Sequence, residues 1–145
     1  MPHHVVRAGG IVEAPVEVVW EMVADARSYK TWTAMTSSTL ERLGEDGADG
    51  VGAIRNFGTG KVFSREEVVV FEPPTRLGYR LLAGLPIQDY VADVTLEPLG
   101  PSSCRVRWEG EFDASRAVGA VMRPFLRFVL GDFVKRLAKH APRRT

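Results

Sequence analysis

The sequence predicts an α+β fold in which one antiparallel sheet packs around a long C-terminal helix. Three observations predict it: a short strand-like segment leads into a helix that starts at a proline, six further strand-like runs follow, and a bulky amphipathic helix spans about residues 115–140. A sheet must cover its apolar face, and the closing helix is the element available for this. If the sheet curves further than side chains can fill, a ligand cavity results.

Length and composition narrow the class of protein. The 145 residues fit one domain, residues 1–145, with a hydrophobic core. Lysine and arginine number 19 and aspartate and glutamate 18, so the net charge of +1 gives no field that would gather nucleic acid, and no such partner is expected. Cys104 is alone and cannot form an internal disulfide. The sequence does not begin with a segment that resembles a signal peptide, so we expect a cytoplasmic protein. No apolar run approaches ~20 residues, so no transmembrane segment is expected. A homodimer is left open.

The first third of the chain predicts a strand and two short helices. Residues 4–13 have the pattern of a strand. Pro15 can begin the first helix, because the N–H group that proline lacks would be unpaired there in any case. Asp25 is a plausible N-cap for a second short helix that ends near Trp32.

Turn residues divide the middle of the chain into six strands. Glycine-rich turns at 44–50 and 58–60, the Pro73-Pro74 pair and Gly100-Pro101 separate the runs. The predicted strands are residues 37–43, 51–57, 63–72, 77–83, 90–99 and 104–113.

The last two strands define the inner face of the sheet, because successive strand residues point to opposite sides. Val106, Trp108 and Phe112 share the apolar face of the final strand. Antiparallel pairing around Pro101 places Val94 opposite Trp108 and Tyr90 opposite Phe112. The inward set of the preceding strand is therefore Tyr90, Ala92, Val94 and Leu96.

A hairpin centred near Gly84-Leu85 extends this map to the strand before. It places Tyr79 opposite Tyr90 and Leu81 opposite Gln88. Two tyrosines would then line one wall of the interior.

The hairpin around residues 58–60 leaves two alternatives, because both of its strands carry charged and apolar residues on either parity. In one, Arg55 lies inward opposite Glu66, Phe57 lies opposite Ser64, and Val68 and Val70 continue the inner face. The inward arginine and glutamate would neutralise each other and could orient a ligand's carbonyl, hydroxyl or carboxylate. In the other, the strand is flipped and both charges form a weak pair in water.

The closing helix carries an apolar stripe that can serve as core, as ligand contact, or as both. Pro124 is expected to kink this helix or to mark a break in it. The stripe consists of Val118, Met122, Phe125, Val129 and Phe133.

Sequence motifs for metal, nucleotide or triad chemistry are absent. The histidines lie at the two ends of the chain, and Gly60-Lys61 lacks the rest of a phosphate-binding loop. No cofactor and no metal are expected. Side chains that could act as acid, base or oxyanion donor toward a bound carbonyl compound are Arg55, Glu66, Tyr79 and Tyr90.

Four segments resemble the START/polyketide-cyclase superfamily (SRPBCC, birch-pollen-allergen-like): EAPVEVVWEMVADARSYKTW, VGAIRNF, SREEVVVFEPPTRLGYRL and PIQDYVADVTLEP. The resemblance covers nearly the whole chain and implies a helix-grip fold, in which a seven-stranded antiparallel sheet wraps around the C-terminal helix. It also favours the inward reading of the uncertain hairpin, although the lysine that anchors acids in this superfamily has no clear counterpart here. The positions that would face the cavity by this resemblance are Arg55, Phe57, Ser64, Glu66, Tyr79, Leu81, Tyr90 and Ala92.

Because this superfamily includes carriers, hormone sensors and cyclases, the fold alone does not select one function. We expect binding or transport of a small hydrophobic molecule with a polar end. One alternative is a polyketide cyclase or aromatase, in which Arg55 and the tyrosines polarise a carbonyl. Another is a protein-interaction module that uses the basic final helix. Whether the protein is an enzyme is left open. The expected ligand-binding residues are Arg55, Phe57, Ser64, Glu66, Tyr79, Leu81, Tyr90, Ala92, Val94, Trp108, Phe112, Met122, Phe125 and Val129.

Overall fold

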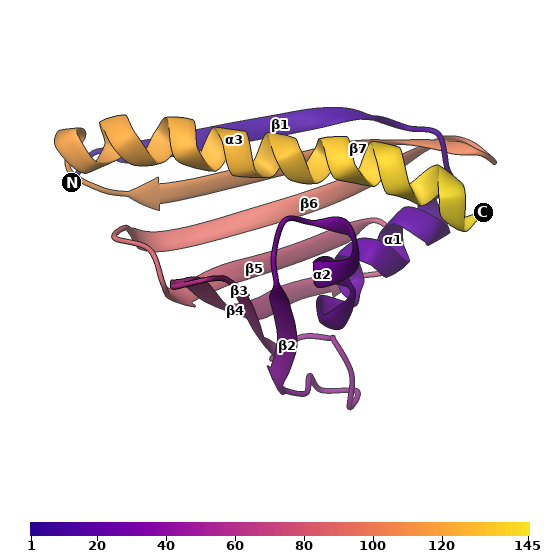
Figure 1. The fold of residues 1–145 in the computed structure, drawn as a ribbon, viewed down its shortest axis with the longest axis horizontal. Helices are drawn as coiled ribbons and strands as arrows, with labels where there is room; N and C mark the ends of the chain where they lie inside the picture. Colours follow the sequence, from indigo (N-terminus) through magenta and orange to yellow (C-terminus); the bar gives the residue numbers. More distant parts are fainter.

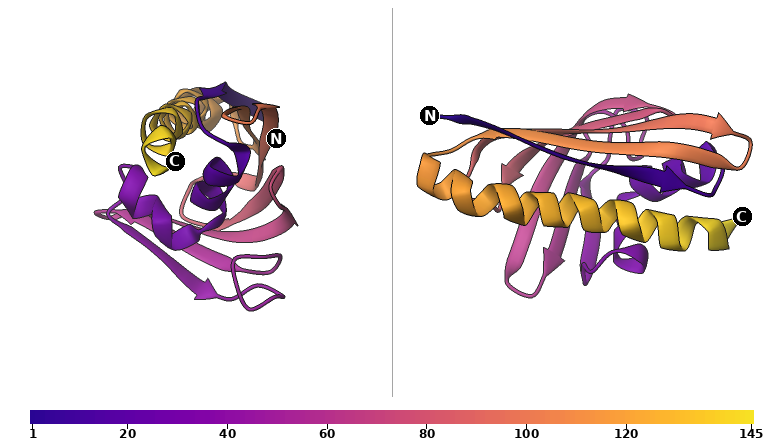
Figure 2. Two further views of the ribbon diagram at one scale, coloured as in Figure 1. Left: turned by 90° about the vertical axis from the view of Figure 1, so that its right-hand side faces the viewer. Right: turned by 90° about the horizontal axis from the view of Figure 1, so that it is seen from above.

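The computed structural model describes residues 1–145 and shows the predicted α+β helix-grip architecture. Seven antiparallel strands form one sheet in the order β1-β7-β6-β5-β4-β3-β2. The sheet curls around one side of the long C-terminal helix. The short helices follow β1 in the chain and lie toward the C-terminal end of that long helix (Figures 1 and 2). The strands are β1 (His3–Val12), β2 (Ser37–Arg42), β3 (Ile54–Thr59), β4 (Val62–Glu72), β5 (Arg76–Ala83), β6 (Gln88–Gly100) and β7 (Ser103–Asp113). The helices are α1 (Val16–Ala24), α2 (Tyr29–Trp32) and α3 (Arg116–His140), with 3-10 turns at Ala26–Ser28 and Ala141–Arg144.

Local chemistry explains where the helices begin. Pro15 precedes α1, as predicted, and the Asp25 carboxylate accepts a hydrogen bond from the backbone N–H of Arg27 at 3.0 Å. Ser115 caps α3 by accepting from the N–H of Val118 at 3.2 Å. These contacts satisfy N–H groups that have no partner inside the helix.

The strand register confirms three of the predicted pairs. Val94 pairs with Trp108, and on the uncertain hairpin Arg55 pairs with Glu66 and Phe57 with Ser64. Tyr90 and Phe112 lie stacked, with ring centroids 6.2 Å apart. The inward reading of β3 therefore holds, since the Arg55 and Phe57 side chains are both buried.

The predicted register between β5 and β6 is wrong by two residues. Tyr79 pairs with Ala92 rather than with Tyr90, and the pairing of β5 with β6 ends at Arg80 and Val91, so Leu81 has no partner on β6. The connection between the two strands spans residues 84–87. It begins at Gly84, which takes a φ of +120° and lies directly against the Phe63 carbonyl, where a Cβ would collide. A shift of two residues leaves every side chain on its predicted face.

A β-bulge in β4 overturns one inward assignment. The register against β5 shifts between Val68 and Val70. Val68 is buried, but Val70 lies on the outer face, where it would contact a Cβ added at Gly78. Phe71 takes the inward position instead, with its ring 5.2 Å from that of Trp20. The inserted residue changes the parity, which alternation cannot predict.

Helix α3 runs unbroken from Arg116 to His140, so of the kink or break predicted at Pro124 the break does not occur (Figure 1). Gly119 lies against the ring of His4 on β1 with no room for a Cβ, which brings the start of the helix close to the sheet. Phe125 and Val129 of the predicted stripe lie to one side of the buried helix face. That face consists of Gly119, Met122, Leu126, Leu130, Phe133, Val134 and Leu137.

Candidate functional site

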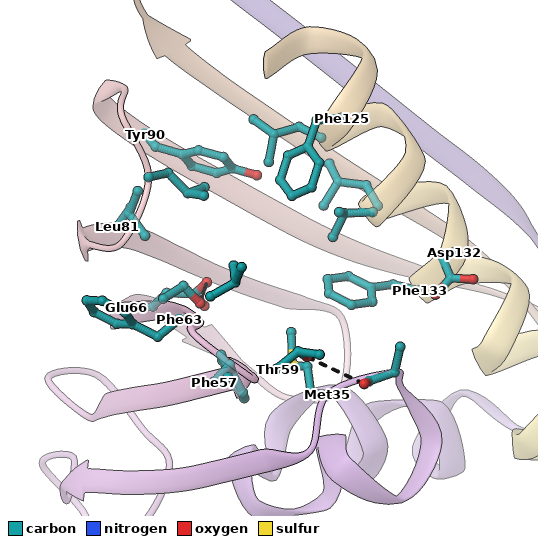
Figure 3. Close-up of a pocket in the computed structure, with 18 of the residues that line it drawn as sticks. Met35, Phe57, Thr59, Phe63, Glu66, Leu81, Tyr90, Phe125, Asp132 and Phe133 are labelled. Atoms are coloured by element: carbon teal, nitrogen blue, oxygen red, sulfur yellow. Dashed lines mark hydrogen bonds between the residues drawn. The ribbon is translucent and has the colours of Figure 1, made fainter. Parts of the chain in front are cut away.

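A cavity of about 340 Å³ lies between the concave face of the sheet and the middle of α3 (Figure 3). Fifteen of its twenty lining residues are hydrophobic. The sheet contributes Phe57, Tyr79, Leu81 and Tyr90, and the helix contributes Phe125 among others. The volume and the apolar lining are typical of sites for small organic molecules.

The mouth of the cavity is lined by apolar side chains that solvent reaches. Val62 and Phe63, near the turn of the β3–β4 hairpin, are 59% and 53% exposed. Phe125 and Phe128 on α3 are 42% and 72% exposed. The sequence analysis did not assign Val62, Phe63 or Phe128 to the site; the available signal was a pair of apolar residues beside a glycine turn, where polar residues are usual.

Glu66 is the charged group on the sheet side of the cavity. The Ser64 hydroxyl donates to its carboxylate at 3.3 Å, and no basic side chain lies within 4.0 Å of it. Burial raises the pKa of the Glu66 carboxyl to about 7, and the positive charge of Arg55 opposes this rise. The carboxyl therefore changes its protonation state near neutral pH.

Arg55 lies behind the cavity rather than in its wall. Its Nη2 donates to the Val23 carbonyl at 3.0 Å, and its guanidinium carbon is 4.9 Å and 5.2 Å from the ring centres of Tyr29 and Phe57. Nε has no hydrogen-bond partner, and the side chain is 1% exposed. Although paired in register with Glu66, Arg55 forms no direct ion pair with it, so the expected contact of this arginine with a ligand has no support in the geometry.

The two tyrosine hydroxyls lie close together in the wall. Trp108 Nε1 donates to the Tyr79 hydroxyl at 3.0 Å, and the Tyr79 O–H can in turn donate to the Tyr90 hydroxyl. The Tyr90 ring lies across Gly110, where an added Cβ would be 2.7 Å from the hydroxyl oxygen. Burial raises the pKa of both phenols. Both therefore keep their protons at neutral pH.

The structure brings part of the predicted ligand-binding set together at the cavity. The residues that line it are Phe57, Ser64, Glu66, Tyr79, Leu81, Tyr90, Phe125 and Val129. The residues buried elsewhere in the core are Arg55, Ala92, Val94, Trp108, Phe112 and Met122. None of this second group lines the cavity, because neighbouring side chains cover them. The His4 ring, for example, stacks on Phe112 with centroids 5.1 Å apart.

Two other features of the chain bear on the class of site. No three His, Cys, Asp or Glu side chains are grouped so that they could hold a metal ion. No helix is long and apolar enough to span a bilayer.

Comparisons with known proteins place the fold among solved structures and identify the family. No curated protein matches the sequence. Among solved structures, a START superfamily protein from Mycobacterium smegmatis superimposes with a TM-score of 0.83 at 16% identity, covering 98% of this chain and 99% of that one. A protein from Thermobifida fusca gives 0.79 at 25% identity, with 96% and 93% coverage. Norcoclaurine synthase from Thalictrum flavum gives 0.75 at 15% identity, with 99% and 89% coverage. The family described as polyketide cyclase/dehydrase and lipid transport matches residues 3–142, and the chain belongs to this family.

Proposed function

We propose that the protein binds a small hydrophobic molecule with a polar end inside the cavity and carries it in this bound form. The observation that supports this most strongly is a volume of about 340 Å³ with a mainly apolar wall and a single unpaired charged group, Glu66. Such a wall gains from removing apolar ligand surface from water, while the few polar groups fix the orientation of the ligand. The family description, which includes lipid transport, agrees with this role.

Access to the cavity would be through the exposed apolar mouth. Phe63 on the hairpin and Phe125 and Phe128 on the helix face solvent beside the opening. An apolar ligand would pass between these rings. Occupation of the cavity would also cover part of this exposed apolar surface.

A plug in the cavity tests the proposal. Phenylbutanol, a neutral molecule with an apolar body and one hydroxyl, serves as the probe in an NMR titration. Leu81→Trp fills the sheet side of the cavity and Val129→Trp the helix side. Each should weaken binding by about tenfold or more, because the ligand and the indole compete for one space.

Val91→Trp provides the matched control. Val91 lies on β6 beside Tyr90 but on the outer face, where it is 40% exposed. This variant should bind phenylbutanol as the natural protein does. Unchanged binding in both plugged variants, each shown by its thermal melt to be folded, would overturn the proposal.

The state of Glu66 favours polyketide cyclase or dehydrase chemistry as a second candidate. A carboxyl with a pKa of about 7, near two protonated phenols in an apolar cavity, is suited to moving a proton during reaction of a carbonyl compound. Conversion of a poly-β-keto thioester, followed by mass spectrometry, separates this candidate from a carrier. An enzyme should lose turnover in Glu66→Gln while its phenylbutanol affinity stays within roughly threefold. A carrier should show no turnover at all.

A further inference from the structure

We propose that the cavity selects hydrophobic molecules that carry a protonated amine, and that the ammonium group binds beside Glu66. This inference rests on the proposed function, because it names the class of ligand for the same cavity. It concerns the polar end of the ligand, which the apolar volume alone does not define.

The charges on the wall are the first argument. Of the twenty lining residues, two are acidic, Glu66 and Asp132, and none is basic. Asp132 already accepts from Arg136 Nε at 2.7 Å, whereas Glu66 receives only the Ser64 hydroxyl at 3.3 Å. A carboxylate has about four acceptor sites, so the cavity side of Glu66 has unused acceptor capacity. An ammonium group, with three donors and a positive charge, is the complementary partner, and a ligand carboxylate would be repelled.

Aromatic rings around Glu66 are the second argument. Seven of the lining residues are aromatic, and Figure 3 shows Phe57 and Phe63 close to the Glu66 side chain. Tyr79 pairs with the neighbouring β4 position Val68, and Tyr90 lies on the next strand. A cation is attracted to the faces of such rings, and the attraction grows where water is excluded. Carboxylate and rings together favour a cation over a neutral hydroxyl.

Arg55 does not reverse this preference, although its charge lies behind the same wall. Its guanidinium is fully buried, is held by the Val23 carbonyl, and lies over the rings of Tyr29 and Phe57. A ligand therefore meets Glu66 and the rings before it meets Arg55. The electrostatic effect of Arg55 is to favour the ionised form of Glu66, which is the form that binds an ammonium group.

Proton linkage gives the proposal a distinct signature. The groups around Glu66 are Arg55 from β3, Ser64 on its own strand, Tyr29 from α2, Tyr79 from β5, Tyr90 from β6 and, across the cavity, Asp132 from α3. Among these, Glu66 is the group that titrates near neutrality. An ammonium ligand favours ionised Glu66, so its binding releases a proton and its affinity rises with pH. A carboxylate ligand should show the opposite trend, and an alcohol a weak one.

Three probes with one skeleton test the inference: phenylbutylamine, phenylbutanol and phenylbutanoate. At about pH 8 the amine should bind about tenfold more tightly than the alcohol, and the acid more weakly than both. Between about pH 5.5 and pH 8 the amine affinity should rise roughly tenfold or more, as expected for a carboxyl that titrates near 7. Calorimetry in buffers of different ionisation enthalpy should detect the released proton.

Glu66→Gln should abolish both the amine preference and its pH dependence, while Glu109→Gln, on the exposed outer face of β7, should retain them. Equal affinity for amine and alcohol would overturn this inference, and so would an amine preference that survives in Glu66→Gln. The proposed function would still stand if phenylbutanol binds the natural protein and binds the Leu81→Trp variant more weakly. If none of the three probes binds, the proposed function itself fails, and this inference fails with it.

Discussion

The interior has a filled end and a hollow middle, and the buried polar groups differ between them. At the filled end, under α1 and the last turns of α3, the Tyr29 hydroxyl and Arg55 Nη2 both donate to the Val23 carbonyl, at 2.8 Å and 3.0 Å. Trp32 Nε1 donates to the Ser28 hydroxyl at 3.2 Å. In the hollow middle, Glu66 has one weak donor inside the protein. The buried polar groups of the filled end thus donate to protein acceptors, apart from Arg55 Nε, whereas Glu66 faces the open space of the cavity.

Phe133 marks the boundary between the two regions. Its ring lies 6.1 Å from that of Trp32 and 4.9 Å from that of Trp108, and it also lines the cavity. Toward the C-terminus of α3, Leu137 is fully buried, whereas on the cavity side Phe128 is 72% exposed. The same helix therefore provides core packing at one end and the cavity mouth in its middle.

The largest effect should come from shortening α3 side chains in the two regions. Leu137→Ala should lower the free energy of unfolding by about 3 kcal/mol, because it leaves a void in a filled core. Phe128→Ala should change it by less than about 0.5 kcal/mol, because the ring is mostly in solvent. Urea unfolding measures both. Equal losses would remove the distinction between the two regions.

Arg55→Met tests whether this arginine belongs to the filled region. Loss of its hydrogen bond to Val23 and of its contacts with the Tyr29 and Phe57 rings should cost about 2 kcal/mol. Affinity for phenylbutanol should change by less than roughly threefold, because Arg55 does not line the cavity. Arg107→Met, on the exposed face of β7, is the control and should affect neither. A variant of normal stability that no longer binds the probe would place Arg55 in the site instead.

Glu66→Gln should raise the free energy of unfolding, because the buried carboxyl destabilises the fold when it is ionised. The pKa of Glu66 rises from an ordinary 4.5 to about 7 on folding, so between these pH values the folded chain holds more protons than the unfolded chain. The free energy of unfolding therefore falls as pH rises through this window. At about pH 8 the variant should be more stable than the natural protein by about 1–2 kcal/mol, and this gain should vanish below about pH 4.5. A gain that is independent of pH would contradict the assignment.

Gly110→Ala should have the smallest effect on stability and a clear effect on the cavity. The new methyl group would meet the Tyr90 hydroxyl and push the ring toward the hollow space. Because that space can accept the ring, the cost should be about 1 kcal/mol, while the affinity for phenylbutanol should fall. Gly100→Ala, at a position with nothing nearby, is the control. Undiminished binding in Gly110→Ala would show that the Tyr90 wall does not contact the probe.

The fold was predictable because it depends on patterns that are local in the sequence. Alternation in β7 identified the inner face through Trp108 and Phe112, and Pro15 marked the start of the first helix. The register of β5 against β6 was not predictable in the same way, because the loop that joins them packs at Gly84 against Phe63, a contact distant in sequence. The bulge that turns Val70 outward likewise leaves no periodic signal.

The site was less predictable, because alternation shows the direction of a side chain and not whether space remains in front of it. Val94 and Tyr90 are both inward on β6, yet only Tyr90 reaches the cavity. Arg55 and Glu66 face each other in register, yet the guanidinium turns to the Val23 carbonyl. Cavity volume is what remains after all neighbouring side chains have packed.

A crystal structure of the protein with an iodinated phenylbutanol tests the central claim most directly, because the anomalous signal of iodine locates the ligand without ambiguity. The predicted result is an iodine peak between Leu81, Tyr90 and Phe125, with the body of the ligand enclosed by the sheet and α3. A structure in which side chains fill this space, with iodine found only on the outer surface, would contradict the account.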